Sequence, residues 1–300
     1  MEHESIPTID LSRLHEAGQA EFLVQRFGEY LLQHHKNLDF AHRHSFYHLV
    51  MFTSGAGQYT IDFTTFALRP YQIYFMIPGQ VHAWDFAGEV DGYVVNFTGS
   101  FFQSFLLKAD YLESFPFFRG IAADGVIDLP VPLGMEVGGT FEKLLTLYPE
   151  KVPFRLDRLR VLLLDLCMQI EQRALTRETH TIPPHHYTLL KNYQKLIEKN
   201  FLTLRRPKEY ADLLAVSSNH LNALCKAHLG KQAGELIRNR ILLEAKRLLV
   251  NLNLNVAEVG YALNFSDNSY FTRFFRKYTG QTPEEFRRAQ GQPIIGAQDR

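Results

Sequence analysis

The stretch VAEVGYALNFSDNSYFTRFFRKYTG, residues 256–280, contains two short amphipathic helical patterns separated by a turn of a few residues. The apolar face of the first pattern consists of Val256, Val259, Gly260 and Leu263. Asn264 suits the end of this helix, because asparagine tolerates the left-handed conformation of a helix C-terminus. Ser266 or Asp267 can cap the N-terminus of the second helix. The stretch therefore predicts a helix-turn-helix.

The second helix of this stretch has one apolar and one polar face. We expect the apolar face to be buried, and it contains Phe271, Phe274, Phe275 and Tyr278. The opposite face contains Asn268, Ser269, Thr272, Arg273 and Arg276. Asparagine can pair with adenine, arginine with guanine, and hydroxyl groups with phosphates, which is the chemistry of a recognition helix in a major groove. A single helix of this kind is more often an ordinary solvent-facing helix.

The same pattern occurs a second time in residues 207–226, and this repetition favours the DNA-binding interpretation. A helix opened by Pro207 has Tyr210, Leu213 and Leu214 facing inward, and a helix after Ser217-Ser218 has Leu221, Leu224 and Cys225 facing inward. Between the two units, Gln232 to Val250 form one amphipathic helix about 27 Å long. That length suits two recognition helices held about 34 Å apart, one turn of DNA.

Residues 187–290 resemble the DNA-binding domain of the AraC/XylS family of transcription regulators. Two segments carry the resemblance, ADLLAVSSNHLNALCKAHLGK (211–231) and RNRILLEAKRLLVNLNLNVAEVGYALNFSDNSYFTRFFRKYTGQTPEEFR (238–287). Thr282-Pro283-Glu284-Glu285 is also a capping box with proline at the first helical position. Three positions depart from the family: Ala223 where a basic residue is frequent, Cys225 where an aromatic residue is frequent, and Asn264 where glycine is usual.

The resemblance implies a regulator, more often an activator, that binds double-stranded DNA, forms a homodimer and contacts RNA polymerase. We predict that bases or backbone are read by Asn219 and Asn222 in the first unit and by Asn268, Ser269, Thr272 and Arg273 in the second. The predicted phosphate contacts are Lys226, Arg276 and Lys277. No catalytic residues are expected.

The N-terminal half has a different pattern. From His44 to Phe97, short runs rich in Tyr, Phe, Ile and Val alternate with Gly, Pro and Ser, which predicts a β-barrel or sandwich. Residues 42–86, HRHSFYHLVMFTSGAGQYTIDFTTFALRPYQIYFMIPGQVHAWDF, are similar to the cupin-type sensor domain of many family members, over about residues 20–130. A small barrel provides a cavity for a small-molecule effector. The predicted ligand contacts are His44, Phe46, His82 and Trp84.

Three histidines in this half invite a metal interpretation. Metal cupins present His-X-His on one strand and a later histidine after a Pro-Gly turn, as His42, His44 and His82 do here. Catalytic cupins also need a carboxylate a few residues further on, where this chain has Ser45 to His48. We therefore expect no metal and no cofactor, and neutral histidines that contact the effector or are hydrogen-bonded inside the barrel. A metal-dependent cupin enzyme remains the alternative for this half.

Helical spacing at Val137–Tyr148 and Phe154–Leu175 predicts a helical appendage to the β domain. Its apolar stripe either mediates dimerisation or packs on the barrel, and contains Leu156, Leu159, Leu163 and Leu166. The predicted fold is multi-domain, β plus α. Its parts are a cupin-like sensing and dimerisation domain (1–175), a linker (176–186), a double helix-turn-helix domain (187–290) and a tail (291–300).

Bulk properties agree with this division. Residues 1–184 contain 14 Lys/Arg and 22 Asp/Glu, a net charge of −8, and residues 185–290 contain 17 and 9, a net charge of +8. Only the C-terminal part therefore suits a polyanion, although such an excess can also be a solvated surface. The acidic N-terminus and the lack of a long apolar run predict a cytoplasmic protein without a membrane partner. Cys167 and Cys225 are expected to be core thiols.

Overall fold

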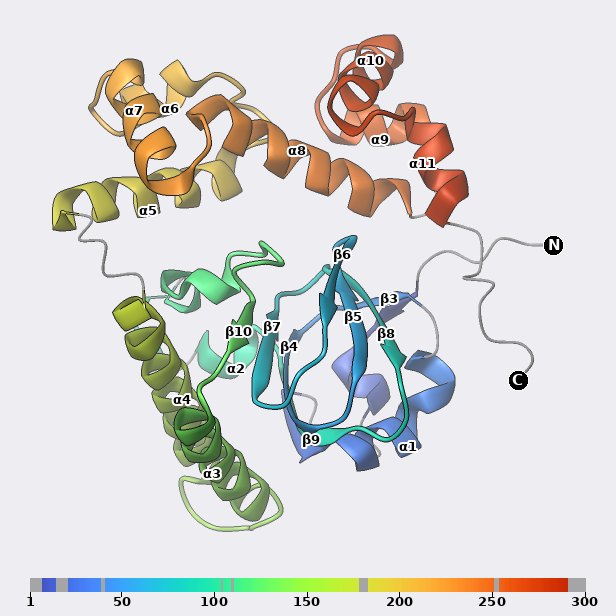
Figure 1. The fold of residues 1–300 in the computed structure, drawn as a ribbon, viewed down its shortest axis with the longest axis vertical. Helices are drawn as coiled ribbons and strands as arrows, with labels where there is room; N and C mark the ends of the chain where they lie inside the picture. The colour runs from blue at the N-terminus through green and yellow to red at the C-terminus, as the bar shows by residue number, and fades with distance from the viewer. Residues whose placement is uncertain are drawn as a thin grey trace. The chain divides into compact units, whose positions relative to one another are not determined.

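The structure is a computed structural model that describes residues 7–14, 21–38, 41–103, 105–108, 111–177, 183–250 and 254–290. The chain divides into two compact units, one of Pro7–Glu178 and one that contains Thr179–Arg300. The first is built on β-sheets and the second is helical, so the predicted β plus α organisation is confirmed (Figure 1). No helix in the described ranges is long and apolar enough to cross a membrane. The predicted tail lies outside the described residues.

The β unit contains two five-stranded sheets that share an interior. The first sheet has the order β1 (Thr8–Ile9), β3 (His42–His44), β8 (Val81–Phe86), β5 (Gly57–Ile61), β6 (Thr64–Ala67). The second has the order β10 (Val126–Asp128), β7 (Gln72–Met76), β4 (Tyr47–Ser54), β9 (Asp91–Phe97), β2 (Phe22–Arg26). Aromatic side chains from both sheets, from α1 (Phe27–Leu38) and from the turn between β3 and β4 fill much of the space between the sheets, among them Phe27, Phe46, Phe52, Tyr59 and Tyr74.

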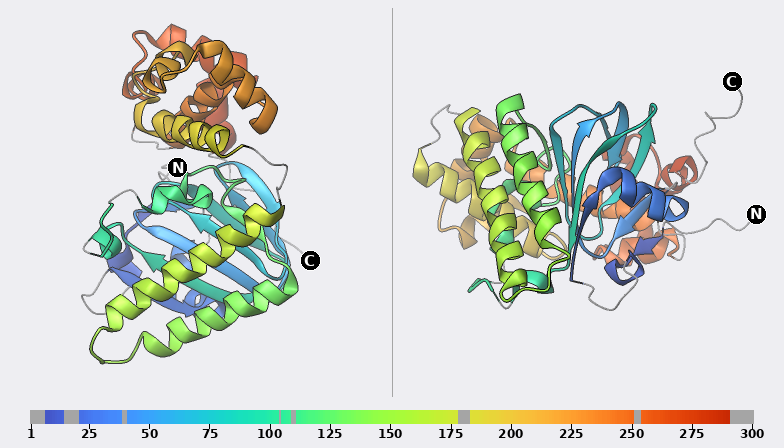
Figure 2. Two further views of the ribbon diagram at one scale, coloured as in Figure 1. Left: turned by 90° about the vertical axis from the view of Figure 1, so that its left-hand side faces the viewer. Right: turned by 90° about the horizontal axis from the view of Figure 1, so that it is seen from below.

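The two long helices of this unit and most of its short elements pack against the second sheet. Figure 2 shows the long helices α3 (Val131–Leu147) and α4 (Arg155–Arg177) lying across the sheet, and their apolar side chains form one core with it. Leu159, Leu163 and Leu166 are buried there, whereas Leu156 is 41% exposed. Most of the predicted stripe therefore packs on the β unit. The short elements are η1 (Leu11–Leu14), α2 (Ser100–Gln103), η2 (Leu112–Ser114) and η3 (Pro116–Phe118).

The helical unit contains both predicted helix-turn-helix units. The first consists of α6 (Pro207–Leu213) and α7 (Ser218–Leu229), and the second of α9 (Val256–Ala262) and α10 (Asn268–Thr279). The other described helices are α5 (Pro184–Asn200), α8 (Ala233–Leu249) and α11 (Pro283–Gln290). Helix α4 continues to Arg177 and α5 starts at Pro184, so both ends of the predicted linker 176–186 are helical. Proline suits a helix start, because the first helical N–H has no intrahelical partner.

The predicted caps and turns are largely confirmed. Asn264 adopts a left-handed conformation with φ of 59°, and Asp267 caps α10 by accepting hydrogen bonds from the N–H groups of Ser269 and Tyr270. The capping box of α11 is also present: Thr282 N–H donates to the Glu285 carboxylate, and Glu285 N–H donates to the Thr282 hydroxyl. These bonds satisfy amides that the start of a helix leaves without intrahelical partners.

Two residues predicted to be inward are not. Leu213 is 58% exposed, because α6 ends there and Ala211 takes the core position beside Tyr210. Tyr278 is 42% exposed, and its ring instead lies 5.1 Å from the guanidinium carbon of Arg238. Phe271 and Phe275 are fully buried as expected.

The first turn contains a left-handed residue that the sequence does not indicate. Ala215 has φ of 53°, at the place that Asn264 occupies in the second unit, and its side chain is exposed. The left-handed region costs an L-residue with a Cβ about 1–2 kcal/mol, and glycine avoids this cost while losing more entropy on folding. We expect Ala215→Gly to raise the free energy of unfolding by up to about 1 kcal/mol, and Ala215→Val to lower it by at least that much.

Urea unfolding followed by far-UV circular dichroism measures these changes. The matched control is Ala227→Gly, because Ala227 is exposed inside the regular helix α7, where glycine should destabilise by about 1 kcal/mol. Equal destabilisation by glycine at both positions would contradict the assigned strain.

Candidate DNA interface and ligand pocket

Both helix-turn-helix units are built on α8. Helix α8 is about 24 Å long. Its buried face contains Ile237, Ile241, Ala245 and Leu249. At its N-terminal end, the Tyr193 hydroxyl donates to the carbonyl of Ala233 at 2.8 Å, and the N–H of Ala233 donates to Asn222 Oδ1 at 3.0 Å. At the other end, the Arg287 guanidinium donates to the carbonyl of Leu249 at 3.0 Å. The first unit is therefore hydrogen-bonded to the start of α8, and α11, the helix that follows the second unit, is hydrogen-bonded to its last turn.

A second set of contacts joins the two units directly. Arg205, just before α6, donates to the carbonyls of Leu263 and Asn264 and lies 4.2 Å from the centre of the Phe265 ring. In return, Asn264 Nδ2 donates to the carbonyl of Leu202 at 3.1 Å. The turn of the second unit is thus hydrogen-bonded to the segment that precedes the first, and together with α8 these bonds limit relative movement of α7 and α10.

Most of the predicted DNA-contacting residues lie at the surface of α7 and α10. The exposed ones are Asn219, Lys226, Asn268, Ser269, Arg273, Arg276 and Lys277. Thr272 is half-buried. Asn222 is also half-buried, and its side-chain oxygen accepts the hydrogen bond from Ala233 N–H. A bidentate contact to adenine needs both the oxygen and the NH₂ group of an asparagine, and here only the NH₂ group is left. Asn222 therefore has a structural role that its sequence position did not indicate.

The exposed end of α10 combines positive side chains with one carboxylate. Hydrogen bonds from the Ser269 backbone hold the pKa of Asp267 below its ordinary value, and Arg273 lowers it further. Tyr270 follows in the first turn of this helix and is 52% exposed. The sequence pattern does not distinguish this tyrosine from a core residue, because it is an aromatic residue next to Phe271. Its exposure adds a hydroxyl and a ring to the candidate interface.

The β unit has a cavity of about 740 Å³ between α1 and the turn that joins β8 to β9, a size suited to a small organic molecule. Trp84 and Phe86 line it with rings stacked 5.9 Å apart, and the charged lining residues are Arg26, Glu29, Glu89 and Asp91. Of the four predicted ligand contacts, only Trp84 lines this cavity. His44, Phe46 and His82 are at most 3% exposed and lie in the interior between the sheets.

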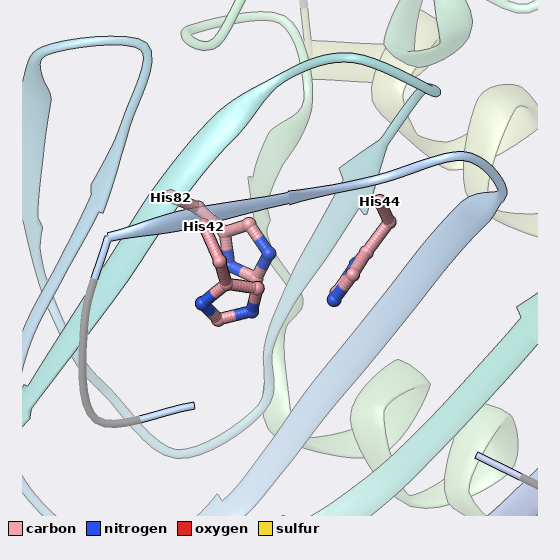
Figure 3. Close-up of side chains that lie close together, drawn as sticks. All are labelled: His42, His44 and His82. Atoms are coloured by element: carbon pink, nitrogen blue, oxygen red, sulfur yellow. The ribbon is translucent and has the colours of Figure 1, made fainter. Parts of the chain in front are cut away.

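The interior holds the three histidines that the sequence had grouped. Nitrogen atoms of His42, His44 and His82 lie within 4.8 Å of one another, and the three rings converge on one space (Figure 3). His48 stands next to them, its ring 4.7 Å from that of His44. Burial holds the pKa of His44 and His82 well below the ordinary value, and it lowers the pKa of His48 to about 3 despite an opposing hydrogen bond to Asn96. The imidazoles of His44, His48 and His82 are therefore neutral at pH 7.

These neutral imidazoles predict that the β unit loses stability in acid. The unfolded chain takes up protons below a pKa of about 6.5, whereas the folded chain does so only at much lower pH. The free energy of unfolding is therefore fully retained above pH 7 and falls as the pH drops, by about 2 kcal/mol per such histidine between pH 7 and pH 5.

Denaturant unfolding followed by the fluorescence of Trp84, the chain's one tryptophan, in a chelating buffer measures this loss. His48→Gln should reduce the pH dependence by about one proton. The same stability at pH 5 and pH 7 would show that the buried imidazoles do not remain neutral.

The fold and these sites define a class of protein in which a β-sheet ligand-binding unit is joined to a double helix-turn-helix. Comparison with known proteins gives the family. Residues 28–164 match the family described as AraC-like ligand binding domain, and residues 210–289 match the helix-turn-helix domain family. The chain belongs to the AraC/XylS family of DNA-binding transcription regulators.

The chain is similar to individual regulators to different extents. The transcriptional regulatory protein YesN of Bacillus subtilis is 36% identical over 88 residues, 28% of this chain and 24% of that protein. The transcriptional activator RhaS of Pectobacterium carotovorum is 20% identical over 249 residues, 82% of this chain and 86% of that protein. The chain spans 24% of the length of YesN and 31% and 32% of the lengths of two other helix-turn-helix regulators that it matches. Among solved structures, apo ToxT K231A of Vibrio cholerae aligns with 91% of this chain at 12% identity and a TM-score of 0.41.

Proposed function

We propose that this protein is a transcription regulator that binds a specific double-stranded DNA sequence and responds to a small-molecule effector in its β unit. The observation that carries the proposal is a pair of helices, α7 and α10, that are the second helices of two helix-turn-helix units in one compact unit and have exposed polar and basic side chains. Each helix enters a major groove. With α8 about 24 Å long between the units, the two grooves are successive ones on the same side of the duplex.

Selection from a random duplex library tests sequence-specific binding. At about 150 mM salt, which suppresses binding to phosphates alone, the full chain should enrich a two-part motif with halves about 10 base pairs apart. Equal recovery of all sequences with a steep salt dependence would instead identify a non-specific nucleic-acid binder. A single short motif would mean that only one of the two helices reads bases.

Two variants separate base reading from phosphate contact. Arg273→Ala should lower discrimination between the selected site and its point variants by about 1–3 kcal/mol, because arginine on α10 pairs with a guanine edge. Lys226→Ala should weaken binding to all sequences alike and reduce the salt dependence by about one counterion. Arg288→Ala, at an exposed position of α11, is the control and should change neither quantity. Competition binding at several salt concentrations measures both. A uniform loss for the two test variants would refute the division of roles.

We propose that the effector occupies the cavity beside Trp84, where aromatic rings can contact an apolar surface and charged groups can orient polar ones. Trp84 is the only tryptophan in the chain, so its fluorescence reports directly on this cavity. An effector found by screening should shift this emission with the same midpoint as its effect on DNA affinity, because linkage couples the two equilibria.

Glu29→Gln and Glu89→Gln change the charge of the cavity lining and should alter the midpoint, whereas Glu136→Gln on the exposed side of α3 should not. An effector that changes DNA affinity without any change in tryptophan emission would place the sensing site elsewhere.

Three further features complete the proposal. Homodimerisation is expected to use the outer faces of α3 and α4, where exposed apolar side chains remain after the inner faces have packed on the sheet: Val131, Met135, Val161 and Met168. Activation through contact with RNA polymerase is the proposed output. The effector is expected to act on the helical unit through the predicted linker, residues 176–186, by favouring one of two states of the protein.

A further inference from the structure

Strand pairing brings four histidines of the β unit together. His42 is the direct antiparallel partner of His82, so the two side chains stand side by side on the same face, with ring centres 4.1 Å apart. His44 is two residues further along β3 and therefore faces the same way, 4.6 Å from the His82 ring. His48, near the start of β4, lies with its ring 4.7 Å from that of His44 and 5.5 Å from that of His82.

Hydrogen bonds fix which nitrogen carries the proton on two of these rings. His48 Nδ1 lies 2.5 Å from Asn96 Oδ1, an acceptor, so Nδ1 holds the hydrogen and Nε2 holds a lone pair. His82 Nδ1 lies 3.0 Å from the Tyr59 hydroxyl. That hydroxyl gives its own hydrogen to Met76 Sδ at 3.3 Å, so its oxygen accepts from His82 Nδ1, and Nε2 of His82 also holds a lone pair.

These lone pairs have nothing to bind within the described chain. Nε2 of His44, His48 and His82 is buried and has no hydrogen-bond partner among the described residues. A buried polar atom without a partner destabilises a protein, which makes several in one place unusual. Metal-binding histidines show the arrangement seen here, in which one ring nitrogen donates to a neighbouring oxygen and the other faces the ion.

The donor set indicates which ions would bind. Imidazole nitrogens suit zinc, nickel, copper and ferrous ions, whereas magnesium and calcium require oxygen ligands that this cluster lacks. In a tetrahedral zinc site the ligand nitrogens stand about 3.3 Å apart, as follows from Zn–N distances near 2.0–2.1 Å. The nitrogens of His42, His44 and His82 lie within 4.8 Å of one another, so side-chain rotations that move them by about an ångström complete the site.

We propose that His42, His44 and His82 bind one divalent first-row transition-metal ion in the interior of the β unit, with His48 as the fourth nitrogen ligand. Asn96 and Tyr59 act as positioning residues that orient two of these rings. The site is separate from the cavity beside Trp84 as the structure delimits it, because none of the four histidines lines that cavity. The proposal goes beyond the regulatory function and does not depend on DNA binding.

Metal analysis of the full chain tests the proposal. After treatment with a chelator and dialysis, the protein is equilibrated with Zn²⁺, Ni²⁺ or Co²⁺, and bound metal is measured by mass spectrometry. We expect one equivalent per chain. X-ray absorption of the wild-type protein with bound Zn²⁺ should show three or four imidazole ligands, a result that needs no variant to fold. Less than about a tenth of an equivalent, or coordination mainly by oxygen, would overturn the proposal.

Variants locate the ion. His44→Gln and His82→Gln should reduce the affinity by at least about 100-fold, and Asn96→Ala by about 10-fold through loss of orientation of His48. The control is the double substitution His185→Gln and His186→Gln, because these residues belong to a histidine group near the surface of the helical unit, and it should leave one equivalent bound. Circular dichroism confirms that each variant is folded. Loss of the ion in this control, with retention in His82→Gln, would assign binding to the surface group instead.

Discussion

The burial of one face of α8 is the constraint on which the helical unit depends. A helix of 17 residues cannot bend much over its length, so whatever is attached to its two ends keeps a nearly constant separation. The first helix-turn-helix is hydrogen-bonded to the start of α8 and the C-terminal helix to its last turn. Arg205 adds a direct link between the two units. Sequence reading by two helices requires this rigidity, since flexible recognition helices would lose the benefit of a fixed half-site spacing.

The β unit follows a different principle, because its interior contains groups that do not stabilise the fold. Apolar residues build the core between α3, α4 and the second sheet, where aromatic and leucine side chains pack on one another. The space between the sheets holds several imidazoles among aromatic rings as well. Burying a polar group without a full set of hydrogen bonds opposes folding. Such groups persist where the surrounding structure is stable enough to hold them, and they are typically found at functional sites.

The sequence predicted the helical unit better than the β unit, for a physical reason. Helix periodicity, caps and the Asn264 turn are local, so four to seven residues determine each of them. The strained Ala215 and the exposed Tyr278 escaped prediction, because the first depends on the turn as a whole and the second on a partner in α8. In the β unit, β2 and α1 were not predicted, and neither was the cavity that they help to form. This cavity is lined by two segments about sixty residues apart in the sequence, and no local pattern encodes the contacts between them.

The histidines show the same limit most clearly. In the sequence, the lack of a carboxylate in the residues after His44 argues against a metal site. His48 is one of the residues that stand where a carboxylate is expected. The structure changes the role of His48, since the hydrogen bond from Nδ1 to Asn96 leaves a lone pair on Nε2, and the His48 ring lies 4.7 Å from the ring of His44. A site of four neutral imidazoles keeps the full +2 charge of a bound ion, whereas a carboxylate would neutralise part of it. Burial of that charge would favour an anion as an additional ligand, because an uncompensated charge in a low-dielectric interior opposes folding.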